Sequence, residues 1–211
     1  MKILNLYAGI GGNRKLWGDE HQITAVELDE NIAKIYKDFF PNDEVIVADA
    51  HQYLLDHYKE FDFIWSSPPC PSHSRLRKGF SMANGAKAVY PDMKLYEEIL
   101  FLQGYFKGKY CVENVKSWYE PLIIPQTLSR HWYWSNIQIP DKKITKGKIN
   151  LTGGWEKQND EMQVKQLEQD LGFNLSNYNI SFSKKRRFLR NCVEPEVGLH
   201  ILLQITNLKE K

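Results

Sequence analysis

The sequence predicts an α/β fold in which helices cover both faces of a mainly parallel sheet. Along the first 115 residues, short apolar runs typical of buried strands alternate with stretches whose apolar residues recur at helical spacing. This alternation is the pattern of βαβ units, whose strands lie parallel. The chain has 211 residues, of which 42% are apolar and 26% charged. That length and composition allow one well-cored domain.

The expected elements follow one another closely. The helix from residue 29 can be capped by Asp29 and ended by Pro41, and a last helix is expected from about Pro195. Ligands of such folds bind at the carboxyl ends of the strands, so the residues there are the first candidates for function. The expected strands are residues 2–7, 22–28, 44–49, 61–67 and 109–115, and the helices between them are 29–40, 50–58 and 91–106.

The pattern of strands and helices breaks after Pro140. The residues that follow are polar and rich in Lys, Gly and Asn, which indicates an insertion or a small subdomain. Order returns with RFLRNCVEPEVGLHILLQI. We therefore divide the chain into a core (1–136), an insertion (137–180) and a segment that returns to the core (181–211).

Composition argues against several classes of protein. No apolar run approaches the roughly 20 residues of a membrane span, and MKILNLYAGIGG lacks the apolar stretch of a signal peptide, so we expect a cytoplasmic protein without a membrane partner. Cys70, Cys111 and Cys192 have no paired spacing, which argues against disulfides and a metal site. The net charge of +2 is small, but residues 141–148 and 183–190 are locally basic. Either a solvated face or a nucleic-acid contact would explain these two runs.

Glycines after the first strand and an acid after the second indicate a nucleoside cofactor. The glycines of NLYAGIGG would let a ligand approach the backbone, although a plain tight turn would also use them. Glu27, 20 residues after Tyr7, can accept hydrogen bonds from two ribose hydroxyls. Asp49 ends the third strand and can either accept from an adenine amino group or cap the next helix. No phosphate-binding GK[ST] is present, so an adenosyl cofactor without phosphates, S-adenosylmethionine, fits better.

The fourth strand ends in SSPPCPSHSRLR, which puts Cys70 directly after two prolines. A free cysteine is usually a small buried hydrophobe, yet a thiol at a strand end near His73, Arg75 and Arg77 can have a lowered pKa. At an ordinary pKa near 8.5, only roughly 3% of a thiol is ionised at pH 7. The basic neighbours are expected to raise that fraction, whereas Cys111 and Cys192 are expected to be packing residues.

These stretches occur in the order found in a known family. LYAGIGG, VELD, VADA, SSPPC, VENV and RNCVEPEVG resemble motifs I, II, III, IV, VI and X of the DNA (cytosine-5) methyltransferases. The resemblance implies a Rossmann-like class I S-adenosylmethionine-dependent methyltransferase fold, with residues 137–180 as a shortened target-recognition insertion. It implies an enzyme of the small phage or bacterial type that methylates C5 of cytosine in double-stranded DNA.

The resemblance also implies roles for single residues. Cys70 is the expected nucleophile that adds to C6 of a flipped cytosine, Glu113 is expected to hold N3 and the exocyclic amine, and Asn114 to support that loop. Arg130 matches the second arginine of motif VIII, which contacts the target base, whereas Leu128 replaces the first. The expected cofactor contacts are Tyr7, Gly9, Gly11, Gly12, Glu27, Asp49 and Asn191.

DNA contacts are expected from two segments. Ser74, Arg75 and Arg77 follow the thiol and are suited to flanking phosphates, although Ser74 could equally cap a turn. An insertion of about 45 residues offers little surface for base contacts, so we expect a recognition sequence of roughly two to four base pairs, or help from a second subunit. The insertion residues expected mainly on phosphates are Lys142, Lys143, Lys146 and Lys148.

Other functions stay open from the sequence. The SPP turn also occurs in enzymes that methylate an exocyclic amine, but an aromatic residue stands there in place of Cys70. Related tRNA methyltransferases share the motifs, so a tRNA substrate is an alternative. A non-catalytic cofactor or nucleic-acid binding module is disfavoured because both Cys70 and Glu113 are present. Pro71, where glutamine is common, and Arg190, where glycine is usual, depart from the family, and no side chain is indicated as the base that removes the C5 proton.

Overall fold

The computed structural model describes residues 1–75, 78–79, 85, 87–143 and 160–206. These residues build a seven-stranded sheet with the order β3-β2-β1-β4-β5-β7-β6, which confirms the α/β prediction. The first five strands along the chain are parallel, and β7 and β6 run antiparallel at one edge. Their bounds are β1 Lys2–Leu6, β2 Gln22–Glu27, β3 Glu44–Val47, β4 Phe63–Ser66, β5 Lys109–Val115, β6 Gln126–Leu128 and β7 His131–Ser135.

The strand order reverses at the centre of the sheet. From β1 the chain first builds outward to β2 and β3, and then returns to place β4 and β5 on the other side of β1. Loops that follow β1 and β4 therefore diverge, and they leave a crevice at the carboxyl ends of these two strands. In open α/β sheets ligands bind at such a reversal.

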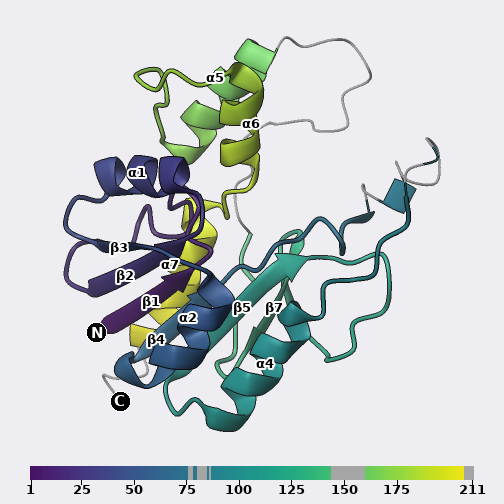
Figure 1. The fold of residues 1–211 in the computed structure, drawn as a ribbon. Coiled ribbons are helices and arrows are strands. Elements are labelled where there is room, and N and C mark those ends of the chain that lie inside the picture. The colour runs from purple at the N-terminus through teal and green to yellow at the C-terminus, as the bar shows by residue number, and fades with distance from the viewer. Residues whose placement is uncertain (76–77, 80–84, 86, 144–159, 207–211) are drawn as a thin grey trace.

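Helices cover both faces of the sheet (Figure 1). Alternate strand residues point to opposite faces, so Leu4 packs with α2 and α4 while Ile3 packs with α7. Asp29 caps α1 by accepting from two backbone N–H groups, as expected from the sequence. The helices are α1 Glu30–Phe39, α2 Ala50–His57, α4 Lys94–Tyr105, α5 Asp160–Leu171, α6 Phe182–Arg190 and α7 Pro195–Thr206, with a 3-10 turn η1 at Tyr58–Glu60.

The hairpin of β6 and β7 is not predicted by the sequence. Leu128 pairs with His131, so only Ser129 and Arg130 form the turn between the strands. Tight hairpins usually signal themselves by glycine or asparagine at positive φ. Here Ser129 takes that conformation, with φ 55°, and the local sequence carries no such signal.

The later part of the expected insertion packs onto the core. Val164, Leu167 and Leu171 of α5 are buried in one cluster with Ile35 and Tyr36 of α1, and Figure 1 shows α1, α5 and α6 gathered at one end of the molecule. Residues 144–159 lie outside the described part of the chain. The assignment of 137–180 to target recognition therefore stays a prediction.

The described residues offer neither a membrane-spanning helix nor a cluster of metal ligands. None of the helices among them is both long and apolar enough to cross a bilayer. Nor do His, Cys, Asp and Glu side chains in that part of the chain gather in a group of three that could hold a metal ion.

Candidate active site

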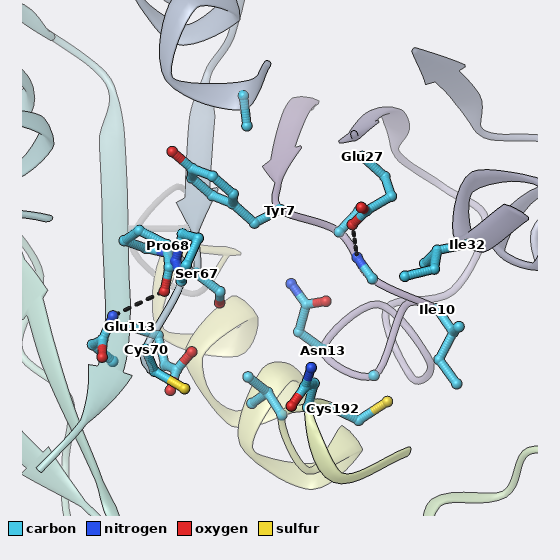
Figure 2. A pocket seen from close by; sticks show the side chains of 18 of the residues that line it. Tyr7, Ile10, Asn13, Glu27, Ile32, Ser67, Pro68, Cys70, Glu113 and Cys192 are labelled. Carbon is cyan, nitrogen blue, oxygen red and sulfur yellow. Dashed lines mark hydrogen bonds between the residues drawn. The ribbon is translucent and has the colours of Figure 1, made fainter. Parts of the chain in front are cut away.

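A pocket of about 580 Å³ opens at the carboxyl ends of β1, β4 and β5. Its volume lies within the range of about 300 to 1,000 Å³ that is usual for small-molecule sites. Figure 2 shows Cys70 and Glu113 at one end of the pocket and Glu27 at the other. The predicted site residues that line it are Tyr7, Gly9, Gly12, Glu27, Asp49, Cys70, Glu113 and Asn191.

The loop after β1 forms the floor of the pocket with a left-handed backbone. Tyr7 and Gly9 have φ angles of 54° and 56°. A Cβ atom added at Gly9 would meet nothing within 4 Å, so the backbone there faces open space that a ligand can occupy. Gly11, expected to contact the cofactor, does not line the pocket, because it packs against Phe40 and a Cβ at Gly11 would collide with that ring.

Glu27 is held in place by two backbone donors. Its carboxylate oxygens accept from the N–H of Gly9 at 2.9 Å and of Asp29 at 3.0 Å. Each oxygen keeps a further acceptor site, so the carboxylate can still receive ribose hydroxyls. The pocket volume, the open backbone at Gly9 and this oriented acid fit an adenosyl cofactor.

Asp49 combines the two roles that its position suggests. One oxygen accepts from the Gln52 N–H at 3.0 Å and caps α2, a hydrogen bond that lowers the pKa of Asp49. The other oxygen lies 4.0 Å from Lys94 Nζ, and the residue borders the pocket. A helix cap and a cofactor contact are therefore compatible at this position.

Replacing Glu27 with alanine is expected to weaken cofactor binding by about 1 to 3 kcal/mol, the scale of lost hydrogen bonds to a charged group. Isothermal titration calorimetry with S-adenosylmethionine measures this loss. Glu30→Ala, an exposed acid in the first turn of α1, is the matched control and should leave the affinity unchanged. Unaltered binding in Glu27→Ala would place the ribose elsewhere.

Cys70 lies in a loop fixed at both of its ends. The N–H groups of His73 and Ser74 donate to the Cys70 carbonyl at 3.0 and 3.1 Å, which starts a helical turn directly after the thiol. Before it, the Pro68 carbonyl accepts from Asn114 Nδ2 at 2.9 Å, a hydrogen bond drawn in Figure 2. This is the support that Asn114 is expected to give.

The expected lowering of the Cys70 pKa is wrong for this arrangement. Burial, and then the nearby Glu113 carboxylate, raise the pKa of the thiol. Two of the basic neighbours are engaged elsewhere: Arg75 Nε donates to the Ser117 carbonyl at 2.9 Å, and His73 Nδ1 lies 2.5 Å from the Tyr119 hydroxyl. Burial also lowers the pKa of His73, which favours its neutral form.

Glu113 lies in the pocket wall at the same end as Cys70 (Figure 2). Beside it lies a histidine that the sequence analysis does not single out. Glu113 is 7% exposed, and its Oε1 lies 3.6 Å from His131 Nε2. His131 lines the pocket, whereas Arg130 does not. The Arg130 guanidinium instead lies 3.1 Å from Glu194. Arg130 lies in the hairpin turn, whereas His131 is the first residue of β7, and this difference is visible only once the hairpin has formed.

A second residue missed from the sequence is the buried Glu98 of α4, which is 1% exposed. Its carboxylate accepts from the Tyr7 hydroxyl at 2.5 Å and from Ser66 Oγ at 2.6 Å, and it lies 3.0 Å from His51 Nδ1. It thereby joins the ends of β1 and β4 to the start of α2, three segments that border the pocket. Its position is a signal in itself, because Glu98 shares an apolar helix face with Leu95 and Leu102.

Glu98 also sets the protonation of its neighbours. Burial and the Glu98 carboxylate raise the pKa of Tyr7 far above its ordinary value, so the phenol stays protonated and donates. The hydrogen bond to Glu98 raises the pKa of His51. The cofactor end of the pocket therefore rests on a buried, hydrogen-bonded carboxylate.

Only some of the expected DNA-contacting residues lie in the described part of the chain. Ser74 forms an isolated β-bridge with Ser117, which holds the loop after Cys70 against the end of β5. Lys142 and Lys143 are exposed and remain proposed phosphate contacts. Arg75 donates to the Ser117 carbonyl, and Arg77, Lys146 and Lys148 lie outside the described residues.

Comparison with known proteins decides the family. The profile for the C-5 cytosine-specific DNA methylases matches residues 1–121, more than half of the chain. The chain belongs to this family. As a cytosine-5 methylase, it transfers a methyl group from S-adenosylmethionine to C5 of cytosine. Among curated proteins, no sequence matches the chain.

Solved structures of two methyltransferases share the fold. The Entamoeba histolytica methyltransferase EhMeth superposes with a TM-score of 0.58 at 11% identity, over 100% of this chain and 99% of that one. A mutant of Spodoptera frugiperda DNMT2 superposes with a TM-score of 0.58 at 17% identity, over 97% and 98% of the two chains. At such low identities the likeness establishes the Rossmann-like methyltransferase fold of this methylase.

Proposed function

We propose that this methylase acts on double-stranded DNA and that it does so through a covalent bond between Cys70 Sγ and cytosine C6. The observation that carries the proposal is the meeting of Cys70 and Glu113 in one pocket with the oriented acid Glu27 (Figure 2). A thiol and a carboxyl group there face the place where a base would enter. The cofactor, held by Glu27, Asp49 and the backbone at Gly9, supplies the methyl group.

The chemistry requires a nucleophile because C5 of cytosine is itself a poor one. Addition of the Cys70 thiolate to C6 shifts the electrons of the C5–C6 double bond toward C5, which can then accept the methyl group. Loss of the C5 proton, to water in our proposal, and departure of the sulfur restore the aromatic ring. The thiolate is regenerated in the last step.

Glu113 has the complementary task at N3. Charge that develops on the ring during thiolate addition is neutralised if N3 receives a proton or a hydrogen bond. A buried carboxyl group near the thiol can provide it, and Glu113 is nearly buried in the pocket wall. Reaching this site from a duplex requires the cytosine to flip out, at a cost of a few kcal/mol.

A basic surface beside the pocket supports a nucleic-acid substrate. Lys184, Arg187 and Arg190 of α6 are exposed, and within the described residues no acid pairs with them. Arg190 also borders the pocket, so the basic surface of α6 extends to the edge of the site. Such cations neutralise phosphates without reading sequence.

Target recognition is assigned in this proposal to the insertion 137–180. Its lysines would hold phosphates while neighbouring side chains reach base edges in the major groove. The small surface supports a recognition sequence of roughly two to four base pairs, or the help of a second subunit. These features support the small type of phage or bacterial enzyme.

The test is a methylation assay that identifies the product. The protein is incubated with tritiated S-adenosylmethionine and either duplex DNA or tRNA, and the labelled nucleoside is identified after digestion. We expect 5-methyldeoxycytidine from DNA, absent with Cys70→Ala. If only tRNA becomes labelled, the substrate is RNA and the proposal of a DNA substrate is wrong. If the label is on the exocyclic amine, the covalent mechanism is wrong.

A further inference from the structure

The pocket wall beside Cys70 holds an imidazole next to a carboxyl group. His131 Nε2 lies 3.6 Å from Glu113 Oε1, and both residues line the pocket. This separation is slightly longer than a hydrogen bond, but catalytic hydrogen bonds are often long before substrate binds and then tighten. Proton exchange between the two groups is therefore within reach.

Strand pairing fixes this arrangement. In the antiparallel pair of β5 and β7, Glu113 stands opposite Tyr133, and Val115 stands opposite His131. Side chains opposite one another share a face of the sheet, so Glu113 and His131 are diagonal neighbours on the face toward the pocket. The sheet backbone, rather than a loop, holds them together.

The two ring nitrogens of His131 differ in their surroundings. His131 Nδ1 is buried and has no hydrogen-bond partner within the described part of the chain. A buried polar atom without a partner is costly. The other ring nitrogen, Nε2, is the one that lies near Glu113 and can exchange a proton with it.

The two tasks of the site conflict unless a proton is held here. Addition to C6 needs Cys70 as a thiolate, yet the Glu113 carboxylate raises the pKa of that thiol. Delivery to N3 needs a proton on Glu113. One extra proton shared by the Glu113 carboxyl group and the His131 imidazole would solve both problems. It would remove the repulsion between the Glu113 carboxylate and the Cys70 thiolate, and it would supply the acid for N3.

Among the groups near Glu113, His131 is the one suited to hold this extra proton. Burial raises the pKa values of Tyr133 on β7 and of Cys111 on β5 well above their ordinary values, so both stay neutral. Glu194, after α6, is paired with Arg130 of the hairpin turn. An imidazole ordinarily keeps its proton about two pH units above a carboxyl group.

We propose that His131 and Glu113 form a proton-holding pair in which His131 passes a proton to Glu113, which donates it to N3 as Cys70 adds to C6. The proposal rests on the proposed covalent function. As the Sγ–C6 bond forms, N3 gains the proton. As that bond breaks and the C5 proton leaves to water, N3 returns its proton through Glu113 to His131. His131 acts through Glu113 and is a positioning residue for that proton.

The test is the pH dependence of kcat in His131→Gln. The active form carries a thiolate and a protonated pair, so the profile is bell-shaped. Because burial raises the pKa of Cys70, the limb at lower pH reports the pair. In the variant we expect this limb to move to lower pH and kcat near neutrality to fall on the order of 10²-fold. Cofactor affinity should be unchanged.

The matched control is His57→Gln, which removes an exposed histidine that lies 2.8 Å from Glu60. It should change neither the lower limb of the pH profile nor kcat.

Combining His131→Gln with Glu113→Gln should lower kcat no further than Glu113→Gln alone, because proton transfer through Glu113 is already lost. An unmoved lower limb, or a further loss in the double variant, would overturn the proposal. His131→Asn repeats the test if the glutamine variant fails to bind cofactor. Methyl transfer by Cys70→Ala would instead overturn the covalent function itself.

Discussion

Replacing Cys70 with alanine will abolish methyl transfer to cytosine while the protein still binds S-adenosylmethionine. Without the sulfur no bond to C6 can form, and C5 stays too poor a nucleophile to react. Cys70 lies at the opposite end of the pocket from Glu27 (Figure 2), so the cofactor contacts should survive. The measurement is trapping on duplex DNA containing 5-fluorocytosine, in which fluorine blocks the elimination that would free the enzyme.

The wild type should form an adduct that withstands denaturing electrophoresis, and Cys70→Ala should form none. The control is Cys111→Ala, which removes a thiol buried in the core and should retain the adduct. An adduct that persists without Cys70 would assign the nucleophile to another residue.

Glu113→Gln is expected to lower methyl transfer by about 10² to 10⁴-fold, the usual contribution of a positioned acid. The amide has the same shape but cannot give a proton to N3. Single-turnover methylation measures the loss, and calorimetry should show nearly unchanged cofactor affinity. Glu120→Gln, at an exposed acid, is the control. A loss confined to cofactor affinity would show that Glu113 serves the other end of the pocket.

The same variant changes the neighbouring thiol in a defined direction. The Glu113 carboxylate raises the pKa of Cys70, so its removal should lower that pKa. The pH at which Cys70 reacts half-maximally with iodoacetamide should therefore fall in Glu113→Gln. This readout separates the charge of Glu113 from its role as an acid.

Much of the fold could be predicted because its signals are local. The strands β1 to β5 are short apolar runs, and Asp29 marks the start of α1 by its place before the first turn. The hairpin of β6 and β7 carries no such signal, since Ser129 supplies the positive φ that glycine usually does. Its pairing with β5 depends on residues distant in the sequence.

The site shows the same division. Motif order pointed to Cys70, Glu113 and Glu27, and the structure places all three around one pocket. The state of the Cys70 thiol could not be predicted, because the turn after it directs Arg75 toward Ser117 rather than toward the sulfur. His131 and Glu98 were missed because their roles exist only once strands and helices have packed.

The cluster around Glu98 has a consequence for how this sequence can diverge. Tyr7, Ser66 and His51 all direct a polar atom at one carboxylate that is 1% exposed. Exchanging a single member leaves a buried donor or acceptor unsatisfied, which costs about 1 to 3 kcal/mol, whereas exchanging the partners together for apolar groups of similar shape can be nearly neutral. The four positions, which lie in four separate segments of the chain, are therefore expected to covary in evolution, and a homologue with phenylalanine at position 7 should carry an altered residue at position 98.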